Sequence, residues 1–268
     1  MSIGFRLASC AVPTLLGFLL AGCSTQSLLD AAASTEKPDQ DGLMRVASDI
    51  ESQGQIVAAL PIYERAAAGS NDAAAQVRLG DAYSRAGKTD QAIQAYRAAL
   101  AVAPDNPDAL LGLGSGLVKA GDAEGAVVAL AKLAPIIKTM AAYNRLGLAQ
   151  TLTGQFAQAH QSFEAASALA PDDLDIRTNL ALAAALDGQE NKAIDVARAV
   201  VTSPGAQARH RRNLMIVYGL LGLVDEGRAS APKGLSASEV KKLLARATAI
   251  RAISDAKARA KALGTIVS

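Results

Sequence analysis

The sequence is poor in cysteine, histidine and aromatic residues. Its 268 residues include two cysteines, two histidines, no tryptophan and only 3% aromatic side chains. A core must therefore be built mainly from Ala, Leu, Val and Ile, which favours closely packed helices. His160 and His210 belong to no metal-binding motif, the glycines form no phosphate-binding loop, and no nucleophilic serine motif occurs. The sequence predicts no metal site, no cofactor, no small-molecule substrate and no enzymatic activity.

The chain also has little net charge. The formal net charge is +2, which is too small to indicate nucleic acid as the main partner. The densest basic cluster is "RHRR" at 209–212, at the expected start of a helix, where positive charge is disfavoured. Arg209, Arg211 and Arg212 are candidate contacts for lipid phosphates or an acidic partner, with a solvated helix face as the simpler alternative.

One apolar run occurs at the N-terminus. It extends from Leu7 to Gly22, is interrupted by serine, proline and threonine, and is too short to span a bilayer of about 30 Å. Residues 20–23, Leu-Ala-Gly-Cys, resemble the lipobox of bacterial lipoproteins. The resemblance implies a signal peptide over residues 1–22, cleavage after Gly22 and acylation of Cys23. An ordinary secreted protein with a chance cysteine at this place is the alternative.

Lipidation would leave the mature chain without a free thiol, because Cys10 leaves with the signal peptide. Two or more acyl chains anchor a protein stably. The serine directly after the cysteine, Ser24, resembles the pattern of outer-membrane lipoproteins. Residues 24–39 carry polar residues and acids without a period, so residues 23–39 are expected to form a lipidated N-terminus and a flexible tether. Such a tether has an average span of about 20 to 24 Å. The expected location is the outer membrane, facing the periplasm.

A repeat fills the remainder of the chain. Residues 73–106, "AAAQVRLGDAYSRAGKTDQAIQAYRAALAVAPDN", resemble a tetratricopeptide repeat (TPR), whose consensus they match at eight positions. These are Leu79, Gly80, Tyr83, Gly87, Ala92, Tyr96, Ala99 and Pro104. Further units start near residues 40, 107, 140, 174 and 208. A long coiled coil is the alternative, but glycine and proline in every half-repeat would break it.

The sequence therefore predicts an all-α TPR superhelix of about five to six helix pairs over residues 40–234. A C-terminal helix and tail are expected over residues 235–268. Ser236 and Glu239 have capping-box spacing, and a helical stripe follows. Val240, Leu243, Ala247 and Ile250 form this stripe, which we expect to pack against the last repeat.

Stacked TPR pairs present a groove lined by their first helices. The candidate groove residues are Leu111, Val118, Asn144, Leu148, Leu152, Thr178, Leu182 and Leu186. This set is mostly neutral and apolar and lacks the Lys, Arg and Asn pattern of TPR domains that clamp a terminal carboxylate. An extended or helical partner segment with apolar side chains is the expected ligand. The alternative is that the four leucines at 148, 152, 182 and 186 belong partly to the core.

From Ser236 to the end, the chain has seven Lys or Arg and two acidic residues, so its tail is basic. The combination of lipobox, tether, repeats and basic tail resembles the TPR lipoproteins of tight-adherence (Flp-type) pilus systems, the TadD group. That resemblance implies a membrane-anchored periplasmic scaffold that assists assembly or outer-membrane localisation of the pilus secretin. Type IV pilotins and scaffolds for outer-membrane protein insertion or cell-wall synthesis are alternatives. A peptidase or hydrolase would need a catalytic domain, for which residues 24–39 and 233–268 are too few.

Overall fold

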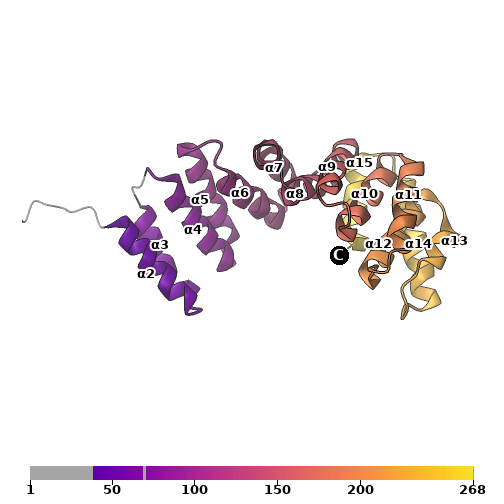
Figure 1. Ribbon diagram of the computed structural model, residues 1–268, viewed down its shortest axis with the longest axis horizontal. Helices are drawn as coiled ribbons and strands as arrows, with labels where there is room; N and C mark the ends of the chain where they lie inside the picture. The colour runs from indigo at the N-terminus through magenta and orange to yellow at the C-terminus, as the bar shows by residue number, and fades with distance from the viewer. Residues whose placement is uncertain (1–38, 69–70, 268) are drawn as a thin grey trace, which may run out of the picture. The chain divides into compact units, whose positions relative to one another are not determined.

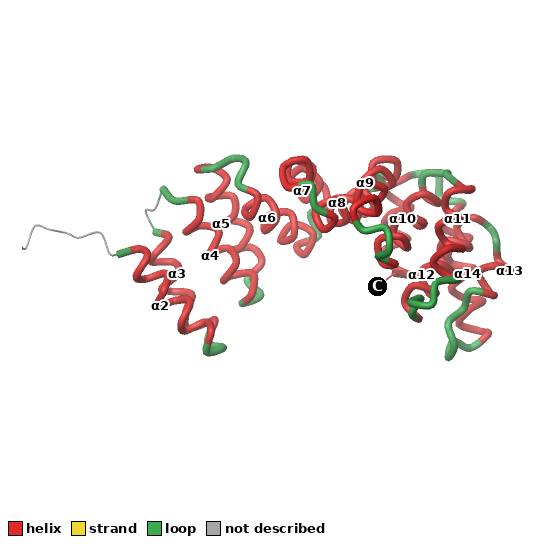
Figure 2. The backbone as a smooth tube through the Cα atoms, in the orientation of Figure 1, coloured by secondary structure: helices red, strands yellow, loops and turns green. Residues whose placement is uncertain are grey.

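The structure is a computed structural model that describes residues 39–68 and 71–267. The predicted signal peptide, Gly22, Cys23 and the tether up to residue 38 lie outside the described residues. Within those ranges the chain forms fourteen helices and no strand (Figures 1 and 2). None of these helices is both long and apolar enough to cross a membrane.

Ten helices form five consecutive pairs within Gln40–Ser268. The first helices are α2 (Gln40–Ser52), α4 (Ala73–Arg85), α6 (Pro107–Ala120), α8 (Met140–Leu152) and α10 (Leu174–Leu186). The second helices are α3 (Ile56–Ala67), α5 (Thr89–Val102), α7 (Ala123–Ile137), α9 (Phe156–Leu169) and α11 (Glu190–Val201). Each helix packs against the helices before and after it, and successive first helices from α4 to α10 also touch one another. The first helices therefore share one surface, which we call the groove face.

Side-chain caps and turn glycines define where these helices begin and end. Asp72, Asn106 and Asp173 each accept a hydrogen bond from a backbone N–H in the first turn of α4, α6 and α10. The turn within each pair has a glycine with φ between 74° and 84°, a conformation that costs side-chain-bearing residues energy. These turn glycines are Gly54, Gly87, Gly121, Gly154 and Gly188. Local sequence thus determines the length of each helix.

Within a pair, a glycine on the first helix makes room for a large side chain on the second. A Cβ atom at Gly80 would lie 2.6 Å from Cε1 of Tyr96, and one at Gly147 would lie 2.9 Å from Cε1 of Phe163. Both distances are far below van der Waals contact. The aromatic rings are buried, with exposed fractions of 3% and 1%, so the second and fourth pairs each close around one ring.

The sixth pair differs from the other five. It begins with α12 (Ala208–Leu221), but the helix that follows, α13 (Val224–Ala229), has only six residues. α14 (Ala237–Arg251) packs along α12 in its place. A Cβ atom at Gly219 of α12 would lie 2.5 Å from that of Ala247, so the two helices approach closely. α14 is therefore the second helix of this pair.

The predicted cap and buried stripe of α14 are confirmed. Ser236 Oγ accepts a hydrogen bond of 3.2 Å from Glu239 N, and Ser236 N donates one of 2.8 Å to Glu239 Oε2. In the stripe, Val240, Ala247 and Ile250 are at least 95% buried and Leu243 is half-buried.

The expected tail forms a further helix, α15 (Ala256–Val267). Asp255 Oδ1 accepts a hydrogen bond of 2.7 Å from Ala258 N and caps its first turn. α15 does not extend the stack of pairs. It turns back and packs against α14 and α8, near α9 and α10 (Figure 1).

Candidate partner-binding groove

Two hollows lie on the groove face. The N-terminal hollow has a volume of about 560 Å³, and Ala74, Val77, Arg78, Asp81, Ser84, Tyr96, Asn106, Asp108, Leu111, Gly112, Ser115 and Arg145 line it. The C-terminal hollow has a volume of about 260 Å³, and Val118, Leu148, Thr151, Leu152, Thr178, Asn179, Leu182, Asn213, Ala260, Leu263 and Gly264 line it. The lining residues of the two hollows differ in polarity.

The N-terminal hollow is polar and charged. Tyr96 donates a hydrogen bond of 2.7 Å from its hydroxyl to Asp81 Oδ1. Burial and this hydrogen bond both raise the pKa of the Tyr96 phenol, so the phenol stays a donor at neutral pH. Arg78 and Arg145 are exposed, and neither has an ion-pair partner among residues 39–68 and 71–267. Asp81 and Asp108 also line the hollow, so its formal charges balance. The two guanidinium groups form no ion pair within the described ranges and can therefore bind carboxylates of a ligand.

A smaller hollow of about 350 Å³ continues this surface towards α2 and shares Arg78 and Asp81 with the N-terminal hollow. Glu51 lies at its edge and accepts hydrogen bonds of 2.9 Å from Arg85 and 2.7 Å from Tyr63. Burial alone would raise the pKa of Glu51, but these two hydrogen bonds outweigh it and lower the pKa. Glu51 is therefore ionised and bonded to Arg85 and Tyr63, so it does not form an ion pair with Arg78.

The C-terminal hollow is apolar, and α15 forms one of its walls. Val118, Leu148 and Leu152 from the first helices have exposed fractions of 37%, 43% and 48%. From α15, Ala260 and Leu263 are buried to exposed fractions of 2% and 4%. The chain's own C-terminal helix thus occupies the part of the groove face that runs from α8 to α12.

The predicted groove residues fall into three environments. Leu111 lines the N-terminal hollow, while Val118, Leu148, Leu152 and the half-buried Leu182 line the C-terminal one. Two others are buried in the helix packing: Thr178, which donates a hydrogen bond of 2.6 Å to the Leu174 carbonyl, and Leu186.

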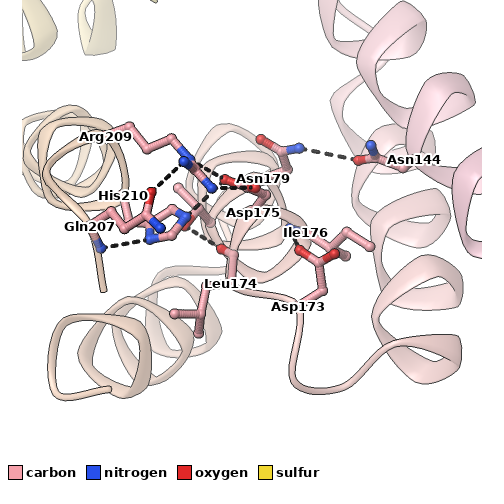
Figure 3. Close-up of polar contacts among 10 residues, drawn as sticks. Asn144, Asp173, Leu174, Asp175, Ile176, Asn179, Gln207, Arg209 and His210 are labelled. Carbon is pink, nitrogen blue, oxygen red and sulfur yellow. Dashed lines mark hydrogen bonds and ion pairs between the residues drawn. The ribbon is translucent and has the colours of Figure 1, made fainter. Parts of the chain in front are cut away.

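The remaining predicted groove residue, Asn144, joins two neighbouring repeats. Its Oδ1 accepts a hydrogen bond of 3.1 Å from Asn179 Nδ2, so the side chains of α8 and α10 meet on the groove face (Figure 3).

The basic cluster at 209–212 is engaged within the chain. Arg209 donates two hydrogen bonds of 2.9 Å to the two carboxylate oxygens of Asp175, and His210 Nε2 lies 2.8 Å from Asp175 Oδ1 (Figure 3). Gln207 N donates to His210 Nδ1 at 3.0 Å, so Nε2 carries the proton when the ring is neutral. Arg211 donates to the Val201 carbonyl at 3.2 Å.

These contacts set the ionisation of Asp175. The hydrogen bond from Arg209 lowers its pKa, partial burial opposes this effect, and His210 adds to the lowering.

Arg212 is half-buried and also interacts with other parts of the chain. Arg209 and Arg211 therefore connect the fifth and sixth pairs.

The other histidine makes a similar contact. His160 Nδ1 lies 3.1 Å from Asp187 Oδ2, across the fourth and fifth pairs. Within the described ranges, no three His, Cys, Asp or Glu side chains are placed to share a metal ion.

A comparison with protein-family models identifies the repeats. The model of the tetratricopeptide repeat family matches residues 77–144 and 144–208. Residues 77–208 are tetratricopeptide repeats. The predicted TPR superhelix is thereby confirmed, and TPR proteins bind protein partners or peptides. A comparison with curated protein sequences found no match.

Solved TPR structures share this fold. MamA of strain AMB-1 is 25% identical, with a TM-score of 0.54 over 59% of this chain and 88% of MamA. YrrB, described as a TPR protein with an unusual peptide-binding site, is 21% identical, with a TM-score of 0.56 over 65% of this chain and 91% of YrrB. A further MamA structure is 18% identical, with a TM-score of 0.56 over 74% of this chain and 97% of MamA.

Proposed function

We propose that this protein is a lipid-anchored periplasmic TPR scaffold that assists assembly or outer-membrane localisation of a tight-adherence pilus secretin. The support for the location is the lipobox-like sequence that ends at Cys23. The support for the partner is the resemblance of nearly the whole mature chain to the TPR lipoproteins of these pilus systems. The scaffold role itself follows from the TPR fold, which binds proteins through repeated surfaces.

The observation that carries the binding mode is the N-terminal hollow. It is open, it spans three successive first helices, and it presents Arg78 and Arg145 without ion-pair partners among the described residues. A partner segment lying along this face would place a carboxylate near each guanidinium, while Val77 and Leu111 provide apolar contact. The proposed ligand is an extended segment of the secretin with at least one acidic residue.

Reversing the two charges tests this mode. Arg78→Glu combined with Arg145→Glu is expected to weaken capture of the secretin from crosslinked envelopes at least about tenfold, since like charges now face the ligand carboxylates. Arg97→Glu is the matched control, because Arg97 is exposed on the second helix α5 and does not line the hollow. Unchanged capture by a folded double variant would contradict the proposed binding surface. The partner would be a different protein if the two arginines were instead required to capture a type IV pilus secretin, an outer-membrane insertion factor or a cell-wall synthase.

The anchor is tested separately. Cys23→Ala is expected to abolish acyl labelling and to release the protein from membranes, because no second lipidation site is proposed. Cys10→Ala is the control, since this cysteine lies within the proposed signal peptide and its loss leaves labelling unchanged. A Cys23→Ala variant that is still labelled and membrane-bound would rule out the lipobox interpretation.

A further inference from the structure

The C-terminal helix α15 lies where a partner of a TPR groove would lie. Its buried residues, Ala260 and Leu263, face residues of the first helices α6, α8 and α10 across the C-terminal hollow. They also join an apolar cluster with Leu186 of α10 and Ile216 of α12. α15 therefore lies against the apolar part of the groove face, whereas no helix of the described chain lies on top of the polar N-terminal hollow.

The attachment of α15 consists of contacts at its two ends and a small apolar face. At the N-terminal end, Lys257 Nζ lies 2.9 Å from Glu124 Oε1, and the guanidinium of Arg259 lies 5.8 Å from the ring centre of Phe156. At the other end, Arg246 of α14 donates a hydrogen bond of 2.8 Å to the Thr265 carbonyl. The side chains of Lys257 and Glu124 are 72% and 60% exposed, so this ion pair contributes little.

Several properties make α15 easy to displace. It has twelve residues, and isolated helices of this length are marginal in water. Its only large, fully buried side chain in the described part is Leu263, because Ala260 has a single methyl group. A hollow of about 260 Å³ remains beside it, with Leu148 and Leu152 still exposed, so α15 fills the site incompletely. Elements with few buried contacts open at a lower free energy than the rest of a fold.

We propose that the C-terminal half of the groove binds an amphipathic helix of a protein partner, and that α15 is an internal occupant which that helix displaces. The partner helix would have a side chain larger than alanine at the place of Ala260 and leucine at the place of Leu263. A basic residue at the place of Lys257 would face Glu124. This inference deepens the proposed function, on which it rests, by specifying the chemistry of a second partner segment.

The backbone of α15 at Ala256 lies directly against Gly154. A Cβ atom at Gly154, in the turn between α8 and α9, would lie 2.7 Å from the Ala256 carbonyl carbon. Gly188 is the equivalent turn residue of the next pair, with φ of 79° against 77° for Gly154, and a Cβ atom there would meet nothing within 4 Å. The two glycines thus differ in their contact with α15 and hardly at all in backbone strain.

A peptide binding experiment on the full-length chain tests the proposal. The probe is a fluorescent peptide of residues 254–268 with Ala260→Leu, which fills the hollow better than α15 itself. Ala260→Asp in the protein places a charge in the apolar site and undocks α15, so the probe is expected to bind at least about tenfold more tightly than to wild type. Ala258→Asp is the matched control on the exposed side of the same helix and is expected to bind like wild type.

Two further variants locate the site and guard against misfolding. Gly154→Ala is expected to speed hydrogen exchange of the α15 amides without tightening probe binding, because the docked probe meets the same added methyl. Gly188→Ala is expected to change neither, although the two glycines have nearly the same φ. Adding Leu148→Asp to Ala260→Asp is expected to weaken probe binding again. Equal binding to wild type, Ala260→Asp and Ala258→Asp, or no binding to any of them, overturns the proposal. Because the probe is a peptide, failure to capture a secretin leaves this result unaffected.

Discussion

Tyr83 of α4 donates a hydrogen bond of 2.7 Å to Glu64 Oε1 of α3, which ties the first two helix pairs together at the surface. Burial raises the pKa of the Tyr83 phenol to about 12, and the hydrogen bond and charge of Glu64 contribute to the increase. The stabilisation is present below the ordinary phenol pKa and is lost as the pH rises through about 12.

Glu64→Gln is therefore expected to lower the pKa of one phenol towards its ordinary value near 10. An ultraviolet titration of the tyrosines measures this shift, and Tyr83→Phe identifies the step by removing it. A titration curve that Glu64→Gln does not change would mean that the carboxylate does not influence this phenol in solution.

The packing of Tyr96 over Gly80 predicts a sensitive core position. Gly80→Ala is expected to destabilise the protein by about 1 to 3 kcal/mol, because the added methyl overlaps the ring. This cost opposes the gain of about 1 kcal/mol that alanine normally brings to a helix interior. Chemical denaturation measures the difference. Gly80→Ala with Tyr96→Leu should recover part of the loss, and a single variant more stable than wild type would refute the overlap.

Asp175 predicts an acid-sensitive junction between the fifth and sixth pairs. Its lowered pKa means that its contribution to stability is present above the ordinary carboxyl value of 3.8 and is lost as the pH falls below it. Asp175→Asn is expected to lower stability at pH 7 by no more than about 1 kcal/mol, since the side chain is 57% exposed. The difference from wild type should shrink towards pH 3. Asp172→Asn, at an exposed neighbouring position, controls for the change in net charge.

The capping box of α14 predicts a local effect on the end of the array. Ser236→Ala is expected to cost about 1 kcal/mol, because the first turn of α14 loses an acceptor for Glu239 N. Hydrogen exchange would show the loss in α14 and in α12 against which it packs, with α4 and α5 unchanged. An equal increase in exchange along the whole chain would indicate that α14 is not a separate cooperative unit.

The repeats can be predicted from the sequence alone, because the residues that determine them act within one helix pair. A cap such as Asp72, a turn glycine such as Gly87 and a glycine beside an aromatic residue, as in Gly80 with Tyr96, act within one helix pair. The repeat period therefore predicts the helices. The capping box at Ser236 is local in the same sense, and it predicts the start of α14.

Features that join distant residues could not be predicted in this way. Lys257 pairs with Glu124, 133 residues earlier in the chain, and no short-range pattern contains that information. Helical spacing of Ala256, Ala260 and Leu263 was the available signal for α15, but it does not indicate which surface the helix covers. Thr178 is buried for a related reason, since packing between neighbouring repeats decides which first-helix positions remain open.

The position of α15 divides the groove face into an open part and an occupied part. A ligand that covers only α4, α6 and the start of α8 binds without rearrangement. A longer ligand must displace α15, and this costs free energy once. Affinity is therefore expected to level off for ligands that reach α8 and to rise again only when the ligand supplies a helix that replaces α15.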